Sequence, residues 1–158
     1  MNSPPKILIR EAALADLPAI VRMLADDELG KTREDNSEDL SESYETAFAE
    51  ISSSESNQLL VSVAGEHVVG VLQLTFVSYL TFKGGRRALI EGVRVASDHR
   101  SKGIGRFMIE DAISRAKARG CHLVQLTSNK ARTEAKRFYE SLGFEASHEG
   151  LKLSLDTT

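Results

Sequence analysis

The sequence of 158 residues has a single cysteine, Cys121, and no tryptophan. One cysteine excludes an intramolecular disulfide, and without a second thiol a thiolate metal site is not expected. We interpret Cys121 as a small, half-buried apolar residue. The chain also lacks any apolar run near the roughly 20 residues that a bilayer crossing needs, and residues 1–5 lack the pattern of a secretory leader. We therefore expect a cytoplasmic protein with no membrane partner.

An excess of basic charge is lacking as well, because 20 Lys and Arg face 23 Asp and Glu for a net charge of −3. Binding to nucleic acid requires a dense basic surface, so we expect no nucleic-acid partner. Hydrophobic residues make up 41% of the chain, which is enough for one sizeable core at this length. No repeat or linker is visible, so residues 1–158 are predicted to form a single domain that acts on small molecules.

The first half of the chain predicts strands and two helices. A strand is expected at residues 6–10, followed by a helix that Asp16 caps and that tolerates Pro18 in its first turn. The acidic, serine-rich stretch 34–55 has apolar residues at helical spacing, which indicates an ordered helix over the sheet; these are Leu40, Tyr44, Ala47, Phe48 and Ile51. Strands at 59–64 and 68–76 then form an antiparallel hairpin.

The second half contains a strand-helix-strand pattern, with a strand at 88–95, a helix at 104–119 and a strand at 123–127. Its two strands should lie parallel. A helix at about 133–142 and a closing strand pair around 144–155 complete the chain. These elements predict an α+β fold in three layers (α/β/α), with a mixed, mostly antiparallel sheet of six to seven strands and about four helices.

An anion-binding loop is predicted between the strand at 88–95 and the following helix. The first amides of a helix have no carbonyl partner, and the helix dipole is positive there, so a phosphate fits. Gly103 and Gly105 allow the backbone to approach the anion, and three cations surround it: Arg100, Lys102 and Arg106. The alternative is a loop whose glycines only form a turn. Neither nucleotide motif is present, because G-x-x-x-x-G-K-[ST] is absent and Met108 replaces the third glycine of G-x-G-x-x-G.

Two stretches of the second half form recognisable motifs. The first is Glu91-Gly92-Val93-Arg94-Val95 followed by Arg100-x-x-Gly103-x-Gly105, and the second is the run Ala135-Lys136-Arg137-Phe138-Tyr139 that continues to Gly143-Phe144. Together they resemble the GNAT superfamily of N-acetyltransferases. The resemblance implies the GNAT fold and acetyl-CoA as cosubstrate. It assigns the coenzyme's pyrophosphate to the loop Arg100, Ser101, Lys102, Gly103, Ile104, Gly105 and Arg106. It assigns the pantetheine arm to the backbone of Val93, Arg94 and Val95, with one amide facing the thioester oxygen.

Acetyl transfer to an amine requires a base for the amine proton and an acid for the leaving thiolate. A phenol with a pKa near 10 can protonate a thiolate whose pKa is about 8.5, and Tyr139 aligns with the general acid of the superfamily. Its alternative role is that of a core aromatic residue beside Phe138. Glu91 is a carboxylate in an otherwise apolar strand, which is costly unless it is exposed or functional. Alternation predicts that Glu91 shares a face with Val93 and Val95, while Arg94 points the other way.

Glu91 could accept the amine proton directly or through a water, or it could simply pair with Arg94 or Arg87. It matches a glutamate of the spermidine/spermine and aminoalkylphosphonate acetyltransferases. The resemblance also makes Asn129, Arg132, Lys136 and Phe138 candidate coenzyme contacts, although Arg132 stands where many relatives have asparagine. Exposed cations on helices are often only solvated. The four histidines show no metal-ligand spacing, so no metal is predicted.

The sequence thus predicts an enzyme that transfers acetyl from acetyl-CoA to a primary amine of a small molecule, with both substrates bound together. The acidic stretch 34–55 would suit a cationic acceptor, whereas Lys83, Arg86, Arg87 and Arg94 would suit a phosphonate-bearing amine. Alternatives are acceptance by a protein or peptide amine, a regulatory module that binds acetyl-CoA without turnover, and a domain for another diphosphate. The resemblance also implies a homodimer.

Overall fold

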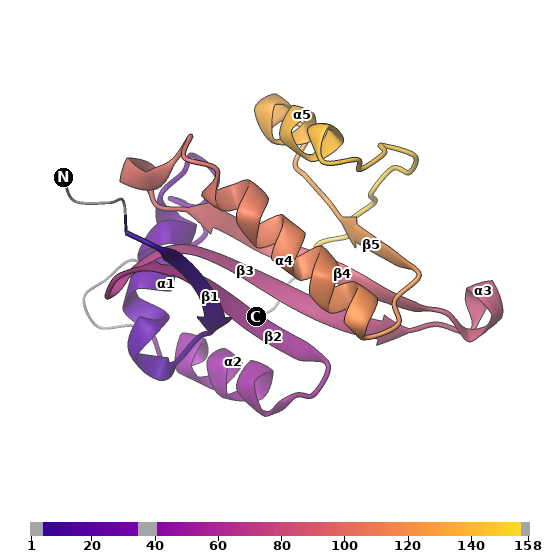
Figure 1. Ribbon diagram of the computed structural model, residues 1–158, viewed down its shortest axis with the longest axis horizontal. Coiled ribbons are helices and arrows are strands. Elements are labelled where there is room, and N and C mark those ends of the chain that lie inside the picture. Colours follow the sequence, from indigo (N-terminus) through magenta and orange to yellow (C-terminus); the bar gives the residue numbers. More distant parts are fainter. Residues whose placement is uncertain (1–4, 35–40, 156–158) are drawn as a thin grey trace.

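The computed structural model describes residues 5–34 and 41–155. Five strands form one sheet in the order in which they occur along the chain. They are β1 Ile7–Glu11, β2 Asn57–Ala64, β3 His67–Ser78, β4 Arg86–Val95 and β5 Leu123–Leu126. Only β4 and β5 are parallel, and the other neighbours are antiparallel. The predicted α+β fold with one parallel strand-helix-strand unit is therefore confirmed (Figure 1).

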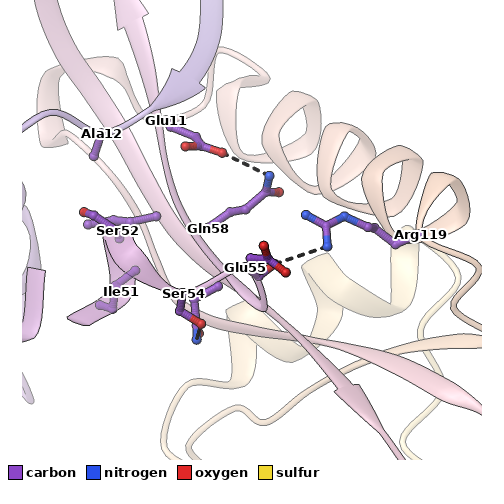
Figure 2. Close-up of a pocket in the computed structure, with 10 residues that line it drawn as sticks. Glu11, Ala12, Ile51, Ser52, Ser54, Glu55, Gln58 and Arg119 are labelled. Carbon is purple, nitrogen blue, oxygen red and sulfur yellow. Dashed lines mark hydrogen bonds between the residues drawn. The ribbon is translucent and has the colours of Figure 1, made fainter. Parts of the chain in front are cut away.

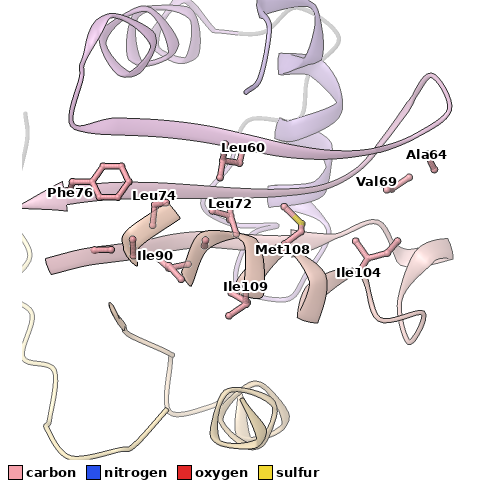
Figure 3. Packing of buried hydrophobic residues seen from close by; sticks show 13 residues of the cluster. Leu60, Ala64, Val69, Leu72, Leu74, Phe76, Ile90, Ile104, Met108 and Ile109 are labelled. Carbon is pink, nitrogen blue, oxygen red and sulfur yellow. The ribbon is translucent and has the colours of Figure 1, made fainter. Parts of the chain in front are cut away.

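Four principal helices flank the sheet, as predicted. They are α1 Leu17–Ala25, α2 Glu42–Ser53, α4 Ile104–Ala118 and α5 Thr133–Ser141; shorter turns are η1 Leu14–Asp16, α3 Thr81–Gly84 and η2 Ser97–His99. Helix α4 lies on one face of the sheet, and α1 and α2 lie on the other, which gives the three layers (Figures 1 and 3). Leu40, which the periodicity assigned to the second helix, lies outside the described residues.

The alternation of apolar residues along β2 and β3 explains how both faces are filled. Leu60, Leu72 and Leu74 are buried on the face that Met108 and Ile109 of α4 cover (Figure 3). The intervening residues point to the opposite face, where α1 packs on them; this second cluster contains Ile20, Met23, Val61, Val63 and Val71. A strand with apolar residues at successive positions is buried on both faces. The core therefore holds the central strands rigidly between α1 and α4.

The start of α1 differs in detail from the prediction. Asp16 precedes α1, but its side chain does not cap that helix. Its carboxylate accepts hydrogen bonds from the guanidinium of Arg10, at 2.6 and 3.0 Å, and from the Ala13 amide at 2.7 Å. A charged partner on β1 and the amide that opens η1 hold the carboxylate more strongly than the α1 amides do. Asp16 thus ties β1 to the helical layer.

The predicted closing strand pair at 144–155 is wrong, so the described sheet has five strands and not six to seven. The segment has the expected alternation in Leu151, Leu153 and Leu155, but these side chains are 92%, 87% and 78% exposed. Alternation makes a strand only where a neighbouring backbone accepts its hydrogen bonds and a face buries its apolar side. Among the described residues, no backbone amide of 145–155 donates to another backbone carbonyl.

The sheet opens at the end of its parallel pair. Pairing between β4 and β5 runs from Arg87 and Leu123 to Ile90 and Leu126, where β5 ends. Strand β4 continues to Val95, so on this side residues 91–95 have no paired strand in the described part of the chain. The exposed edge of β4 leads directly to the start of α4. This opening is where the sequence placed the thioester.

A β-bulge in β4 overturns the predicted alternation. Glu91 pairs with Gln73 and Arg94 with Val71, so Gly92 and Val93 together stand opposite the single residue Leu72. Gly92 has φ of 64°, the left-handed conformation that such a bulge requires. Gln73 and Val71 share one face of β3, so Glu91 and Arg94 share that face too. Val93 and Val95 instead pack against the α4 side of the core.

Candidate active site

The first turn of α4 presents backbone amides without protein acceptors. Gly103 is the N-cap and has φ of 80°, and no side chain caps the helix. None of the amides of residues 101–106 donates to a protein acceptor within the described residues. A Cβ added to Gly103 would meet no atom within 4 Å, so the space in front of the helix is open. An anion fits this end of α4 because it would satisfy the amides and the helix dipole together.

The cations of the loop are held by backbone carbonyls and exposed carboxylates. Arg100 donates from Nε to the Val95 carbonyl at 3.2 Å, and Lys102 donates to the Asp98 carbonyl at 3.0 Å. Arg106 reaches Glu110 at 3.5 Å, a pair in which both side chains are about half exposed. Exposed pairs of this kind contribute little to stability. These side chains can therefore turn toward a phosphate at little cost.

Gly105 brings α4 close to α5. A Cβ at this position would lie 3.4 Å from Cζ of Phe138 and 3.8 Å from Cγ2 of Val95. Ile104, the other apolar residue of the loop, is buried at 4% exposure in the core. Phe138 and Ile104 thus serve as packing residues that fix the loop against β4 and α5. Ser101 has φ of 61°, an uncommon conformation for a residue with a side chain, and it turns the chain into the loop.

Tyr139 lies half-buried on α5, facing the core. Its ring packs edge-to-face on Phe138 and Phe144, with centroid distances of 5.2 and 5.9 Å. Burial raises the pKa of the Tyr139 phenol, and the positive charges of Arg94 and Arg132 offset part of that rise. The phenol is therefore protonated at neutral pH, as a general acid must be. Tyr139 and the edge residues Val93 and Val95 of β4 pack against the same core cluster.

Glu91 is exposed on β4, on the face that it shares with Arg94. The two ion pairs considered from the sequence do not form. Arg94 pairs with Asp27, and Arg87 donates to Oε1 of Gln125 at 3.2 Å. Within the described part of the chain, Glu91 makes no ion pair. An exposed carboxylate without a cationic partner is available to accept a proton.

The remaining predicted coenzyme contacts surround the start of α5. Asn129 accepts the Ala131 amide on its side-chain oxygen at 2.9 Å, which shapes the turn before the helix. Lys136 is exposed and lies 3.8 Å from Glu140. Arg132 points to a different partner and donates to Oδ2 of Asp27 at 2.5 Å. The structure thus joins the α5 start to the segment that follows α1.

Asp27 is the site residue that sequence reasoning missed. It lies two residues after α1, and its Oδ2 also stands 3.2 Å from Nε of Arg94. Burial raises the pKa of Asp27, but the Gly30 amide and the guanidinium groups of Arg94, Arg132 and Arg33 lower it by more, so the carboxylate is ionised. The only sequence signal is the acidic run Asp26-Asp27-Glu28, and no motif connects it to residues 67 and 105 positions away.

Two hollows lie outside this constellation. The one drawn in Figure 2 is lined by β1, the end of α2, the start of β2 and Arg119. Gln58 donates to Glu11 and Arg119 donates to the Glu55 carbonyl across it. Arg119 follows the last residue of α4, so this hollow lies at the opposite end of that helix from the anion loop. The second hollow, between α1 and Ala96-Ser97, borders the strand end that leads into the loop.

The described part of the chain offers neither a metal-binding cluster nor a membrane-spanning helix. Residues 5–34 and 41–155 contain no cluster of three His, Cys, Asp or Glu side chains that could hold a metal ion. Nor does any helix there combine the length and the apolarity needed to cross a bilayer.

Several known proteins resemble this chain in sequence or in fold. The model of the family described as "Acetyltransferase (GNAT) family" matches residues 20–144. A crystal structure described as a transcriptional regulator from Bacillus halodurans C-125 is 53% identical, with a TM-score of 0.93 over 95% of this chain and 100% of the other. An L-methionine sulfoximine/L-methionine sulfone acetyltransferase of Pseudomonas aeruginosa is 28% identical over 141 residues, which cover 88% of this chain and 80% of that protein.

A more distant structure shares the fold. It is that of a predicted acetyltransferase with acetyl-CoA from Clostridium acetobutylicum, 20% identical, with a TM-score of 0.73 over 94% of this chain and 96% of the other. The architecture is therefore retained at low sequence identity.

Proposed function

This chain belongs to the GNAT acetyltransferase family and is an N-acetyltransferase with acetyl-CoA as cosubstrate, and from that premise we propose that it acetylates the primary amine of a small molecule. Both substrates bind together, and the amine attacks the thioester directly. Acetyl-CoA supplies the activated acetyl group. Glu91 accepts the proton that the amine loses, directly or through a water, and Tyr139 gives its proton to the leaving sulfur.

The open start of α4 supports the placement of the coenzyme. The unpartnered amides from Ser101 to Arg106 and the exposed cations of the loop provide both dipole and charge for a pyrophosphate. From there the pantetheine arm follows the unpaired edge of Val93 to Val95. The bulge at Gly92 removes a β4 residue from the ladder with β3, which supports an amide of Val93 as the donor to the thioester oxygen. Asn129 and Lys136 are proposed as outer contacts of the coenzyme.

The single observation that carries the proposed chemistry is the position of Tyr139. Its ring packs against the same core cluster as Val93 and Val95 of the open edge of β4, and burial raises the pKa of its phenol. A protonated phenol at that edge matches the need for a proton on the leaving sulfur. Glu91 stands on the same strand and is exposed to an approaching acceptor.

The class of acceptor is supported by a relative. The Pseudomonas aeruginosa protein is described by its action on L-methionine sulfoximine and L-methionine sulfone, both small molecules with a primary amine. This favours a small acceptor over the polyamines and phosphonates that the motif suggests, and over a protein or peptide amine. A second candidate function is a regulatory module that binds acetyl-CoA without turnover, which the description of the Bacillus halodurans protein favours.

A thiol-release assay across a panel of amines tests the proposal. The panel contains L-methionine sulfone, a polyamine, an aminoalkylphosphonate and a lysine-containing peptide, each with acetyl-CoA. We expect thiol release above the rate without amine for the amino acid. Tight binding of acetyl-CoA by calorimetry with no thiol from any amine would instead establish the regulatory module. Release from the peptide alone would identify a protein acetyltransferase.

We also propose that two copies of the chain associate. Leu151, Leu153 and Leu155 alternate with other residues along the C-terminal segment and are each more than three-quarters exposed. Within residues 5–34 and 41–155, strand β5 is at the edge of the sheet, so it presents an unpaired row of amides and carbonyls. Each copy thus offers both an exposed apolar segment and an edge, which a twofold arrangement could satisfy reciprocally.

A further inference from the structure

Two arginine side chains converge on one carboxylate beside Tyr139. Oδ2 of Asp27 accepts a hydrogen bond from Arg132 at 2.5 Å and lies 3.2 Å from Nε of Arg94. The Arg94 side chain is only 12% exposed, and those of Arg132 and Asp27 are 28% and 25% exposed. These residues come from β4, the start of α5 and the segment after α1. The structure therefore builds a cationic cluster that no single motif encodes.

The positive charge of this cluster is not fully neutralised. Arg94 and Arg132 share one carboxylate, and Nε of Arg94 is buried without a hydrogen bond although Asp27 is near. Burial and the charge of Arg132 lower the pKa of Arg94, and Asp27 offsets only part of that effect. Buried charges are normally paired and hydrogen-bonded. The cluster can therefore accept another anionic group.

The cluster lies on the proposed acceptor side of β4. The bulge places Arg94 on the same face as Glu91, away from the face on which Val95 packs toward α4. Arg94 is three residues from Glu91, about 10 Å of strand at most, and the long arginine side chain can shorten that gap. Tyr139 is near enough for both guanidinium groups to act on its phenol. The proposed base and the cationic cluster therefore share one face of β4, whereas Tyr139 packs on the core cluster of the α4 side.

We propose that Arg94 and Arg132 form a subsite for a carboxylate of the acceptor, and that the acceptor is an α-amino acid. This inference rests on the proposed acetyl transfer and specifies its substrate. An α-amino acid carries its amine and its carboxylate on one carbon, so both groups fit between Glu91 and the two guanidinium groups. Guanidinium groups bind carboxylates through paired hydrogen bonds, which makes them selective for this shape.

Asp27 occupies the subsite in the structure described here. Its Oδ1 accepts the Gly30 amide, so the segment after α1 positions the carboxylate independently of the arginines. Between Arg94 and Arg132 it reduces the repulsion of two like charges. An acceptor carboxylate takes over the contacts of Oδ2 while Asp27 remains attached to Gly30. Asp27 is therefore a positioning residue, and the two arginines are the binding residues.

The test compares L-methionine sulfone with its carboxamide, in which the anionic carboxylate is replaced by a neutral group. We expect wild-type kcat/KM, measured by thiol release, to favour the acid by roughly 10²-fold, as expected for a site whose charged hydrogen bonds lose their partner. R94Q and R132Q should each reduce that preference by about tenfold or more through the KM of the acid, and leave the KM of acetyl-CoA unchanged. R137Q, an exposed arginine of α5, is the matched control and should retain the preference.

Several outcomes would overturn the subsite. One is an unchanged preference for the acid in both variants, and another is equal use of the acid and the amide by the wild type. A third is a rise in the KM of acetyl-CoA alone in the variants, because that result would assign the arginines to a coenzyme phosphate. If R94Q does not fold, R94K retains the charge without the planar fork and should still weaken selection of the acid. If no amine releases thiol, the proposed function fails separately. Calorimetry of the acid and the amide with coenzyme A present then decides the subsite, because equal binding excludes it.

Discussion

At the scale of single residues, a substitution at Tyr139 distinguishes a role in the chemical step from a role in coenzyme binding. Its phenol is protonated at neutral pH because burial raises its pKa, so it can supply a proton to the leaving sulfur. We predict that Y139F lowers kcat by about 10²-fold, within the usual range for loss of an acid catalyst, while the Kd for coenzyme A stays unchanged. Y79F, on the β3–β4 hairpin, should keep full turnover. Unchanged kcat in Y139F would remove this residue from the mechanism.

Asp16 makes a prediction about stability and pH. Hydrogen bonds from Arg10 lower its pKa below the ordinary value of 3.8; burial opposes this effect, and the Ala13 amide adds to it. The unfolded chain therefore binds more protons near that pH, so this contribution is complete above about pH 5 and is lost as the pH falls through the folded-state pKa. D16N should lower the free energy of unfolding by about 1–3 kcal/mol at pH 7, and by less at pH 3.

Urea denaturation at both pH values measures this effect. E28Q, which removes an exposed ion pair with Lys31, is the control and should leave stability nearly unchanged. An equal loss at pH 3 and pH 7 for D16N would show that its role is packing and not charge.

At the scale of elements, the start of α4 joins the sheet to the coenzyme. Gly103 has φ of 80° and Gly65 of the β2–β3 hairpin has φ of 62°, and a Cβ at either position would meet no atom within 4 Å. G103A and G65A should therefore lose similar stability, about 1–2 kcal/mol, for the same left-handed strain. We predict that only G103A weakens coenzyme A binding, by about tenfold or about 1.4 kcal/mol, because its added methyl group would enter the open space that we propose for the pyrophosphate.

Calorimetry with coenzyme A and thermal unfolding of both variants provide the two measurements. Equal affinity in G103A and G65A would contradict the proposed role of the α4 start. The same element shows why the loop could be predicted. A glycine pattern between a strand and an amphipathic helix is a local property, and the helix begins at Ile104 as expected.

At the scale of the whole molecule, an isolated copy leaves the apolar side chains of the C-terminal segment exposed to solvent. We predict a dimer by light scattering of the purified protein, and its conversion to a monomer by L153D, because a charge cannot be buried in an apolar contact. L80D changes a leucine that is 97% exposed at the tip of the β3–β4 hairpin and should leave the dimer intact. A wild-type monomer, or dissociation by L80D alone, would contradict this interface.

The sequence by itself determined the order of the main elements as far as α5, the parallel strand-helix-strand unit, the loop at Arg100–Arg106 and the place of Tyr139 on its helix. Each of these depends on residues close together in the chain, where spacing, glycines and capping govern local conformation. The site residues assigned through the family resemblance remain predictions, and the variants above test Tyr139, Gly103, Arg94 and Arg132 among them.

Only the tertiary structure decided which distant residues meet. Asp27 and Arg132 are 105 positions apart and join because the segment after α1 and the start of α5 pack at the same end of the sheet. The bulge at Gly92 placed Arg94 on the face of Glu91, since one inserted residue reverses the alternation that a regular strand would have. The leucines after residue 150 did not become a strand, because pairing requires a neighbouring backbone and not a periodic pattern alone.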